Sequence, residues 1–167
     1  MTRRRNIILA PALAVPMIAV AIAGCGGGSG NANATPSTTT TKQPSASGGA
    51  TVNVRSTSLG KILVDSSGRS LYLFEKDTGS KSTCFGACAT AWPPFRTNGK
   101  PMAGTGVTAA LLGTTTRSDG NPEVTYNGHP LYYYAGDQKA GDTNGQALNQ
   151  FGAPWYVVSP AGKKIVG

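Results

Sequence analysis

The chain has 167 residues, enough for a single domain, and a formal net charge of +8 at pH 7. Its basic residues form no cluster and no stripe that alternates with aromatic side chains, which argues against nucleic acid as a partner. It holds one His and three Cys, too few to indicate a catalytic triad or a metal centre built from several histidines.

The first 24 residues have the features of an export signal. Arginines at positions 3–5 precede an uncharged run over residues 7–23, which ends in Ile22-Ala-Gly-Cys25. A basic start, an apolar core and small residues before the cleavage point are typical of such signals. The last four residues resemble the bacterial lipobox, in which the Cys is acylated and becomes the new N-terminus. We therefore expect residues 1–24 to be a lipoprotein signal peptide and Cys25, carrying palmitate-type chains, to anchor the protein in the lipid bilayer.

Two questions about this segment stay open. An uncleaved membrane anchor is the alternative to lipidation, but residues 7–23 are near the lower limit for spanning a bilayer, and Pro11 and Pro16 interrupt them. The run Arg4-Arg5-Asn-Ile-Ile loosely resembles a twin-arginine signal, so the general secretory and twin-arginine routes both remain. Loss of residues 3–5 reduces fifteen basic residues to twelve, against seven acidic ones, a surplus that favours solubility and mild attraction to anionic lipid or wall polymer.

Residues 25–50 are predicted to be a lipidated Cys followed by a disordered tether. From Gly26 to Ala50 the chain is almost entirely Gly, Ser, Thr, Asn, Pro and Ala, with Lys42 as the one charge. Such a composition buries too little apolar surface to offset the entropy of ordering. A tether of this length spans roughly 25 to 30 Å, so the folded part can stand clear of the membrane. The threonines at residues 38–41 are candidates for glycosylation.

The folded part, residues 51–167, contains one ten-residue motif twice. Residues 68–77 return sixty positions later as residues 128–137, with matched types at five positions. The matched pairs are Gly68/Gly128, Leu71/Leu131, Tyr72/Tyr132, Phe74/Tyr134 and Asp77/Asp137. A repeat of fixed period indicates two copies of one unit, each too small to bury its own apolar face. We expect one all-β or mostly β domain, with repeat one at about residues 60–95 and repeat two at about 120–160.

Each motif is predicted to be a strand that is covered on both faces. Leu71 and Leu73 would face one side of the first strand. Tyr72 and Phe74 would face the other, and residues 131–134 repeat this alternation in the second copy. Because both faces are apolar or aromatic, each strand needs packing above and below it.

The other expected elements complete two hairpins and add short flanking elements. Residues 61–65 pair with the first motif through a Ser/Gly turn, and residues 123–126 pair with the second through Asn127-Gly128, which suits the positive φ angles of a type I′ turn. Further strands are expected at residues 51–54 and 155–158. Short helices are expected at residues 82–91, capped by Ser82 or Thr83, and at residues 107–112.

The motifs and the stretches between them resemble a known family. Residues 68–77, followed by residues 82–89 and Trp92-Pro-Pro94, are similar to the bacterial predicted lipoproteins with a Tyr-x-(Phe/Trp/Tyr)-x-x-Asp motif, also called secreted repeats of unknown function. The later stretches that agree are Leu112-Gly-Thr and residues 117–120, 124–128, 141–145 and 155–160. The resemblance covers about residues 60–162. It implies an exported, repeat-containing protein and supplies no substrate, cofactor or catalytic residue.

Asp and Trp residues follow both motifs. Asp77 and Asp137 lie where an Asp side chain accepts hydrogen bonds from turn backbone, so we expect each to order a turn. A metal-binding or catalytic carboxylate pair is the alternative. Trp92 and Trp155 are expected to fill the core, with stacking on a ligand as the alternative. Asp142 alone brings too little charge for Ca²⁺, so residues 141–145 are predicted to be a turn.

Cys84 and Cys88 are expected to form a disulfide, because paired cysteines of small exported domains are oxidised. On a helical turn their Cα atoms would lie about 6 Å apart, within disulfide range. The alternative is a soft copper site in which Met102 and His129 join the two cysteines. Their spacing does not match a zinc knuckle or a covalent haem site. His129 by itself is typical of a surface hairpin residue.

No nucleophile elbow, phosphate-binding loop or zinc-protease motif occurs in the chain. The sequence therefore predicts an exported, membrane-anchored lipoprotein of the cell envelope that is not an enzyme and needs no cofactor. Its expected role is to bind or position an envelope protein or polymer. The alternative is a redox or metal-binding accessory protein of the envelope that carries copper or haem.

Overall fold

The computed structural model describes residues 48–167. The predicted signal peptide, Cys25 and nearly all of the predicted tether lie outside the described residues. The described elements, in chain order, are β1 (Thr51–Thr57), β2 (Gly60–Asp65), β3 (Tyr72–Phe74), α1 (Ala87–Ala91), β4 (Met102–Ala103), the 3₁₀ helix η1 (Ala109–Leu111), β5 (Leu112–Thr116), β6 (Pro122–Tyr126), β7 (His129–Pro130), β8 (Asn149–Gln150) and β9 (Ala153–Val157).

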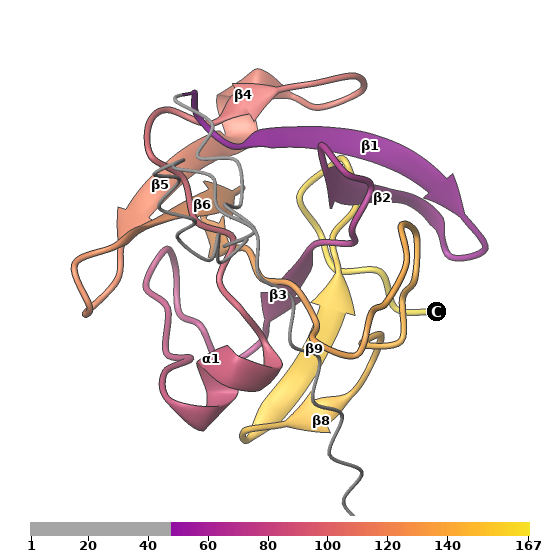
Figure 1. Cartoon of the computed structure of the whole chain (residues 1–167). Coiled ribbons are helices and arrows are strands. Elements are labelled where there is room, and N and C mark those ends of the chain that lie inside the picture. The colour runs from indigo at the N-terminus through magenta and orange to yellow at the C-terminus, as the bar shows by residue number, and fades with distance from the viewer. Residues whose placement is uncertain (1–47) are drawn as a thin grey trace, which may run out of the picture. The chain divides into compact units, whose positions relative to one another are not determined.

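The strands form three small sheets, with the orders β2-β1-β4, β5-β6-β7 and β3-β9-β8. The prediction of a mostly β domain is confirmed. Figure 1 shows the long β1–β2 hairpin at the top of the view and β3 beside β9 below it. The pairing of β1 with β2 is antiparallel and in register from Val52 opposite Asp65 to Thr57 opposite Gly60.

Both predicted hairpin turns form. Asp65 N donates to Arg69 O (2.9 Å) across the first turn, where Gly68 has a φ of 81°. In the second, Asn127 and Gly128 have φ angles of 49° and 80°, as a type I′ turn requires. The expected strand at residues 51–54 is longer than predicted and becomes β1, because it pairs along the whole of β2.

The two motif segments lie between two hydrophobic clusters, as the alternation of their side chains predicts. Only the first is a regular strand (β3), because β7 ends at Pro130 and the second motif continues with isolated bridges at Tyr132. Tyr72, Phe74 and Tyr132 belong to one cluster, together with both tryptophans. The leucines at positions 71, 73 and 131 belong to the other cluster, which includes Val124 and Tyr126 of β6. All these side chains are buried, whereas Tyr133 and Tyr134 are partly exposed. The first motif is therefore fully covered on both faces and the second in part.

The two motifs pair directly with each other. Tyr72 N donates to Tyr132 O and Tyr132 N donates to Tyr72 O, both at 2.9 Å. This is the reciprocal pattern of two equivalent residues related by a two-fold axis. The two repeats therefore meet at the central tyrosine of each motif.

Each motif strand also pairs with the Trp-bearing segment of the other repeat. In the first motif, Phe74 of β3 is opposite Trp155 of β9. In the second motif, the N–H groups of residues 133 and 135 donate to Pro93 O (2.8 Å) and Ala91 O (2.9 Å), on either side of Trp92. Each motif therefore takes its strand partner from the other repeat, and backbone hydrogen bonds join the two repeats directly.

The same exchange recurs at the outer end of each motif. Each repeat there closes a triangle of three backbone hydrogen bonds, two of which cross between repeats. The bonds are Leu63 N to Val158 O (2.8 Å), Leu71 N to Leu63 O (3.0 Å) and Val158 N to Leu71 O (3.2 Å), matched by Val124 N to Phe95 O (2.9 Å), Leu131 N to Val124 O (3.0 Å) and Phe95 N to Leu131 O (2.8 Å). The match defines an approximate two-fold relation between the repeats. Under it, the positions equivalent to Leu63, Leu71 and Val158 are Val124, Leu131 and Phe95, in that order.

The helix predictions were wrong in extent. The expected helix at residues 82–91 is reduced to α1, which begins after Gly86 with no side-chain cap. Ser82 and Thr83 do not cap it, because their side chains bond to distant groups: Thr83 to Asp77, and Ser82 to Tyr132 and Arg117. The expected helix at residues 107–112 is only the single turn η1.

Candidate binding site

The tyrosines and aspartates of the repeated motif form two crossed hydrogen bonds. Tyr72 Oη donates to Asp137 Oδ2 (2.7 Å), and Tyr132 Oη donates to Asp77 Oδ2 (2.6 Å). Burial, and then the neighbouring carboxylates, raise the pKa of both phenols well above the usual value. The phenols thus stay neutral and keep donating to the partner repeat.

The second oxygen of each carboxylate orders the turn that follows its own motif. Asp77 Oδ1 accepts from Thr83 N and Thr83 Oγ1, both at 2.7 Å. Asp137 Oδ1 accepts from Asn144 N (2.9 Å). Each Asp therefore links a local turn to the other repeat's tyrosine.

Four aromatic rings stack through the centre of the domain. Phe74 stacks on Trp155 (4.0 Å between centroids), Trp155 on Trp92 (4.0 Å), and Trp92 meets Tyr134 at a tilt (4.5 Å). Successive rings come from alternate repeats, as the exchanged pairing requires. Both tryptophans are fully buried and their indole N–H groups donate to Gln150. No indole face remains open to a ligand, so the tryptophans fill the core.

A buried ion pair that sequence reasoning missed lies beside the second Tyr–Asp bond. Arg117 Nη1 lies 2.9 Å from Glu123 Oε2, and both side chains are at most 1% exposed. Arg117 also donates to Ser82 Oγ (2.8 Å) and to Cys84 O (2.6 Å). Burial raises the pKa of Glu123 to about 7, even though Arg117 beside it acts in the opposite direction. Nothing in the local pattern of Arg117 or Glu123 distinguishes them from exposed charges.

The predicted disulfide between Cys84 and Cys88 is present, with the Cα atoms 5.2 Å apart. Cys84 lies before α1 and Cys88 within it, so the bond joins the helix to the extended chain that precedes it. Both residues are buried in the cluster that holds the tryptophans. Through Cys84 O and Ser82 Oγ, Arg117 connects this segment to repeat two.

The residues of the alternative copper site lie on separate elements. Cys84 and Cys88 are joined to each other and offer no thiolate. Met102 is half exposed on β4, and His129 is paired with Tyr126 at the start of β7. Within residues 48–167 no group of three or more His, Cys, Asp or Glu side chains is placed to hold a metal ion.

Comparison with known proteins bears directly on the two repeats. A family model described as "Secreted repeat of unknown function" matches residues 53–96 and 113–159, more than half of the chain. The chain belongs to this family. The secreted-repeat protein is thus an exported one, and the two matched segments contain its two motifs. No curated protein and no solved structure matches the chain. Among the described residues, no helix is long and apolar enough to cross a membrane.

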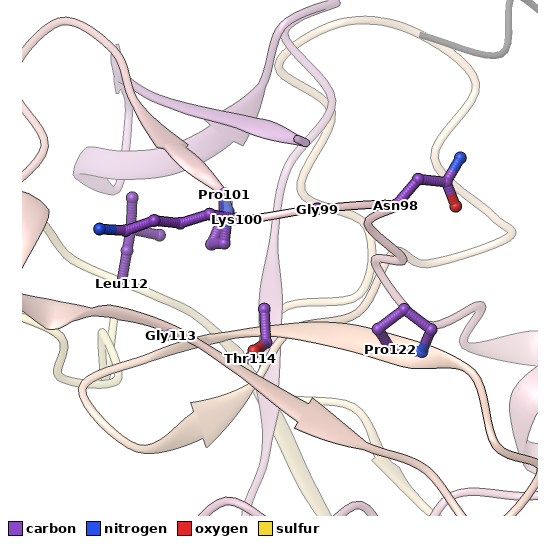
Figure 2. Close-up of a pocket in the computed structure, with 8 residues that line it drawn as sticks. All are labelled: Asn98, Gly99, Lys100, Pro101, Leu112, Gly113, Thr114 and Pro122. Carbon is purple, nitrogen blue, oxygen red and sulfur yellow. The ribbon is translucent and has the colours of Figure 1, made fainter. Parts of the chain in front are cut away.

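The secreted-repeat domain carries a cavity of about 470 Å³, here called the loop cavity. Residues 98–101 line one side, and Leu112, Gly113 and Thr114 of β5 line the other, with Pro122 nearby. Figure 2 shows the 98–101 segment running above β5, with Thr114 directed toward it. Most of this lining lies between the two family-matched segments, and Lys100 supplies its single charged side chain.

A larger depression of about 780 Å³, here called the hairpin groove, lies where the repeats meet. It is lined by residues of the first hairpin turn (65–69), by residues 93–96 and by Tyr133 of the second motif. Tyr133 Oη donates to Asp65 Oδ2 (3.0 Å), and Asp65 Oδ1 accepts from Ser67 N (2.8 Å) and Arg69 N (2.9 Å). The carboxylate thereby fixes both the turn and the ring.

Arginines dominate the charge of the hairpin groove. The guanidinium of Arg69 lies 3.9 Å from the centroid of the Tyr133 ring and has no carboxylate within 4.0 Å among the described residues. Arg96 pairs with Asp119 (3.2 Å) at the surface. Asp65 is buried and committed to Tyr133 and the turn. No sequence signal indicated this groove, because its three segments meet only through tertiary pairing.

Proposed function

We propose that the protein is a lipoprotein anchored through Cys25 outside the cytoplasmic membrane, and that it holds a non-enzymatic binding domain in the cell envelope. The hairpin groove is its binding surface. The partner is an envelope polymer or protein, reached by a domain that the tether separates from the bilayer.

The observation that carries the binding role is which polar and aromatic groups already bond or stack within the domain and which remain at its surface. The motif tyrosines and aspartates bond to one another, the tryptophans are stacked on both faces, and the two thiols are joined. Several other polar groups, among them Arg69, Ser66 and Ser67, converge on the hairpin groove, whereas the loop cavity has Lys100 as its single charged side chain. Concave surfaces with a few converging polar groups are the usual place for ligands.

The anchoring role rests on the lipobox and on the tether. A single acyl chain holds a protein to a membrane only marginally, whereas two chains hold it stably. Bacterial lipoproteins of the type that Ile22-Ala-Gly-Cys25 resembles carry more than one chain. The family's secreted character agrees with export by the basic and apolar segment at residues 1–24.

Fractionation of cells that produce Cys25→Ala tests the anchor. We expect the wild-type protein in the membrane fraction with acyl chains on Cys25 by mass spectrometry, and the variant released from it. A Cys25→Ala protein that stays in the membrane and retains residues 1–24 would show that the segment is a plain anchor.

Metal analysis of protein purified from its native envelope tests the binding class. We expect sub-stoichiometric copper, iron and zinc. One equivalent of any of these, together with free thiols at Cys84 and Cys88, would favour the metal-binding or redox accessory instead.

A further inference from the structure

We infer that the hairpin groove binds an anionic polyol or saccharide chain through its phosphate or carboxylate groups, with Arg69 as the principal contact. The assignment deepens the proposed binding role and does not depend on the lipid anchor. It rests on the geometry of Arg69, on the composition of the groove and on a comparison with the matching place in repeat two.

Arg69 is held in an orientation that suits an oxyanion. Its guanidinium carbon lies over the Tyr133 ring, 3.9 Å from the centroid, and Tyr133 is itself fixed by the bond to Asp65. No hydrogen bond or ion pair among the described residues occupies its side-chain N–H groups, so the edges of the guanidinium are free. Those edges match the two oxygens of a carboxylate or phosphate, and a pre-positioned fork loses little entropy on binding.

The rest of the lining suits a chain of hydroxylated units. Exposed Ser66 and Ser67 present hydroxyls beside Arg69, while Pro93 and Pro94 contribute partly exposed apolar surface. Arg96 adds a second cation, which Asp119 holds in a surface ion pair. A volume of about 780 Å³ is much larger than one phosphate ion, so it fits an anionic chain of more than one unit.

The matching place in repeat two is occupied by the chain itself. The approximate two-fold relation puts Tyr126 and Asn127 where repeat one has Asp65 and Ser66. There Tyr126 Oη donates to Pro160 O (2.8 Å), and Asn127 Nδ2 donates to Gly162 O (3.1 Å). A Cβ atom on Gly162 would lie 2.3 Å from that of Asn127, so the fit is close. In repeat two this position is therefore filled by residues 160–162, which accept hydrogen bonds from the Tyr126 hydroxyl and the Asn127 amide. In repeat one the same position stays open.

Calorimetric titration of the full-length lipoprotein in neutral detergent, at low salt, tests the assignment. The probes are a short poly(glycerol phosphate) chain, a galacturonate oligosaccharide and a neutral maltooligosaccharide of similar length. We expect at least one anionic chain to bind at least ten-fold more tightly than the neutral one. The stronger of the two anionic probes distinguishes a phosphodiester source from a carboxylate source.

Variants locate the site. Arg69→Gln should weaken binding of the anionic chain about ten-fold or more, because one charge-assisted fork is lost. Arg69→Lys, which keeps the charge but not the fork, should recover only part of the affinity. Lys100→Gln in the loop cavity is the matched control and should change affinity less than two-fold. Because the Arg69 side chain is exposed and lies outside both cores, these variants should unfold at the wild-type temperature.

Three results would overturn the assignment. The first is no binding of either anionic chain. The second is equal affinity for the neutral chain. The third is an equal loss in Arg69→Gln and Lys100→Gln, which indicates attraction to general surface charge. None of these bears on anchoring, which the Cys25→Ala fractionation decides separately.

Discussion

Tyr132 Oη lies 2.6 Å from Asp77 Oδ2, and this hydrogen bond joins the motif of repeat two to the motif of repeat one. Its counterpart joins Tyr72 to Asp137. The Tyr and the Asp within one motif therefore do not hydrogen-bond to each other. Their fixed spacing sets two bonds across the interface between the repeats.

Removing one of these hydroxyls should destabilise the domain more than removing a hydroxyl at its surface. Tyr132→Phe leaves the ring in place but takes a donor from the buried Asp77, for an expected loss of about 1 to 3 kcal/mol. Urea unfolding measures it. Tyr156→Phe is the control, since the Tyr156 hydroxyl makes no hydrogen bond among the described residues. Equal stability of the two variants would contradict a structural role for the crossed bond.

Gly145→Ala should disturb the aromatic stack without changing any aromatic residue. A Cβ at this position would lie 2.7 Å from the Trp92 ring and 3.0 Å from the Tyr72 ring, and neither ring has room to retreat. Overpacking of this kind costs about 1 to 3 kcal/mol, and the lower melting temperature should coincide with altered tryptophan fluorescence. Gly99→Ala, whose Cβ would meet nothing closer than 3.9 Å, should leave both unchanged.

The stack and the crossed bonds show which parts of the fold were open to prediction. The alternation of Leu71, Tyr72 and Leu73 places neighbouring side chains on opposite faces by strand geometry alone, so both clusters were foreseeable. The partner of each strand was not, because the pairing joins residues far apart in the sequence, from Pro94 and Tyr132 (38 positions) to Tyr72 and Val157 (85 positions), and no local signal encodes it. Thus the two repeats were predicted, but the pairing of each motif with the Trp-bearing segment of the other repeat was missed.

Glu123 should make stability depend on pH. Its pKa rises from the ordinary 4.5 to about 7 in the folded protein because of burial. Between these values the folded state holds more protons than the unfolded one, so the contribution of Glu123 to stability is full below pH 4.5 and falls as pH rises toward 7. Glu123→Gln cannot titrate, so urea unfolding between pH 4.5 and 7 should show a flatter profile than the wild type. Parallel profiles would contradict the assignment.

The pair of Arg117 and Glu123 also marks a limit of sequence reasoning. Charged residues are seldom buried unless they are paired, and their positions in the sequence do not reveal that these two are. The same limit applies to the start of α1. Ser82 and Thr83 are ordinary helix caps by type, but tertiary bonds to Tyr132, Arg117 and Asp77 take their side chains elsewhere.

Reducing the disulfide should loosen one segment and leave the domain folded. The bond closes a ring of only five residues, which in the chain-entropy model stabilises by about 2 kcal/mol. Hydrogen exchange measured by mass spectrometry should therefore rise across residues 80–94, while β1, β2 and β6 remain protected. Because Cys84 O accepts from Arg117, a smaller rise is expected around residue 117. Two reactive thiols in the natively exported protein would contradict the disulfide.

The exchange of Trp-bearing segments makes each repeat the pairing partner of the other. A chain with a single repeat would leave its motif strand without a partner, and a second copy of that chain would supply the crossed Tyr–Asp bonds and the exchanged backbone pairing. The present domain is therefore arranged like an approximately two-fold homodimer whose halves are joined in one chain. The segment between the matched regions, residues 97–112, raises the effective concentration of one half for the other to the order of millimolar, so assembly no longer depends on how much protein the cell exports.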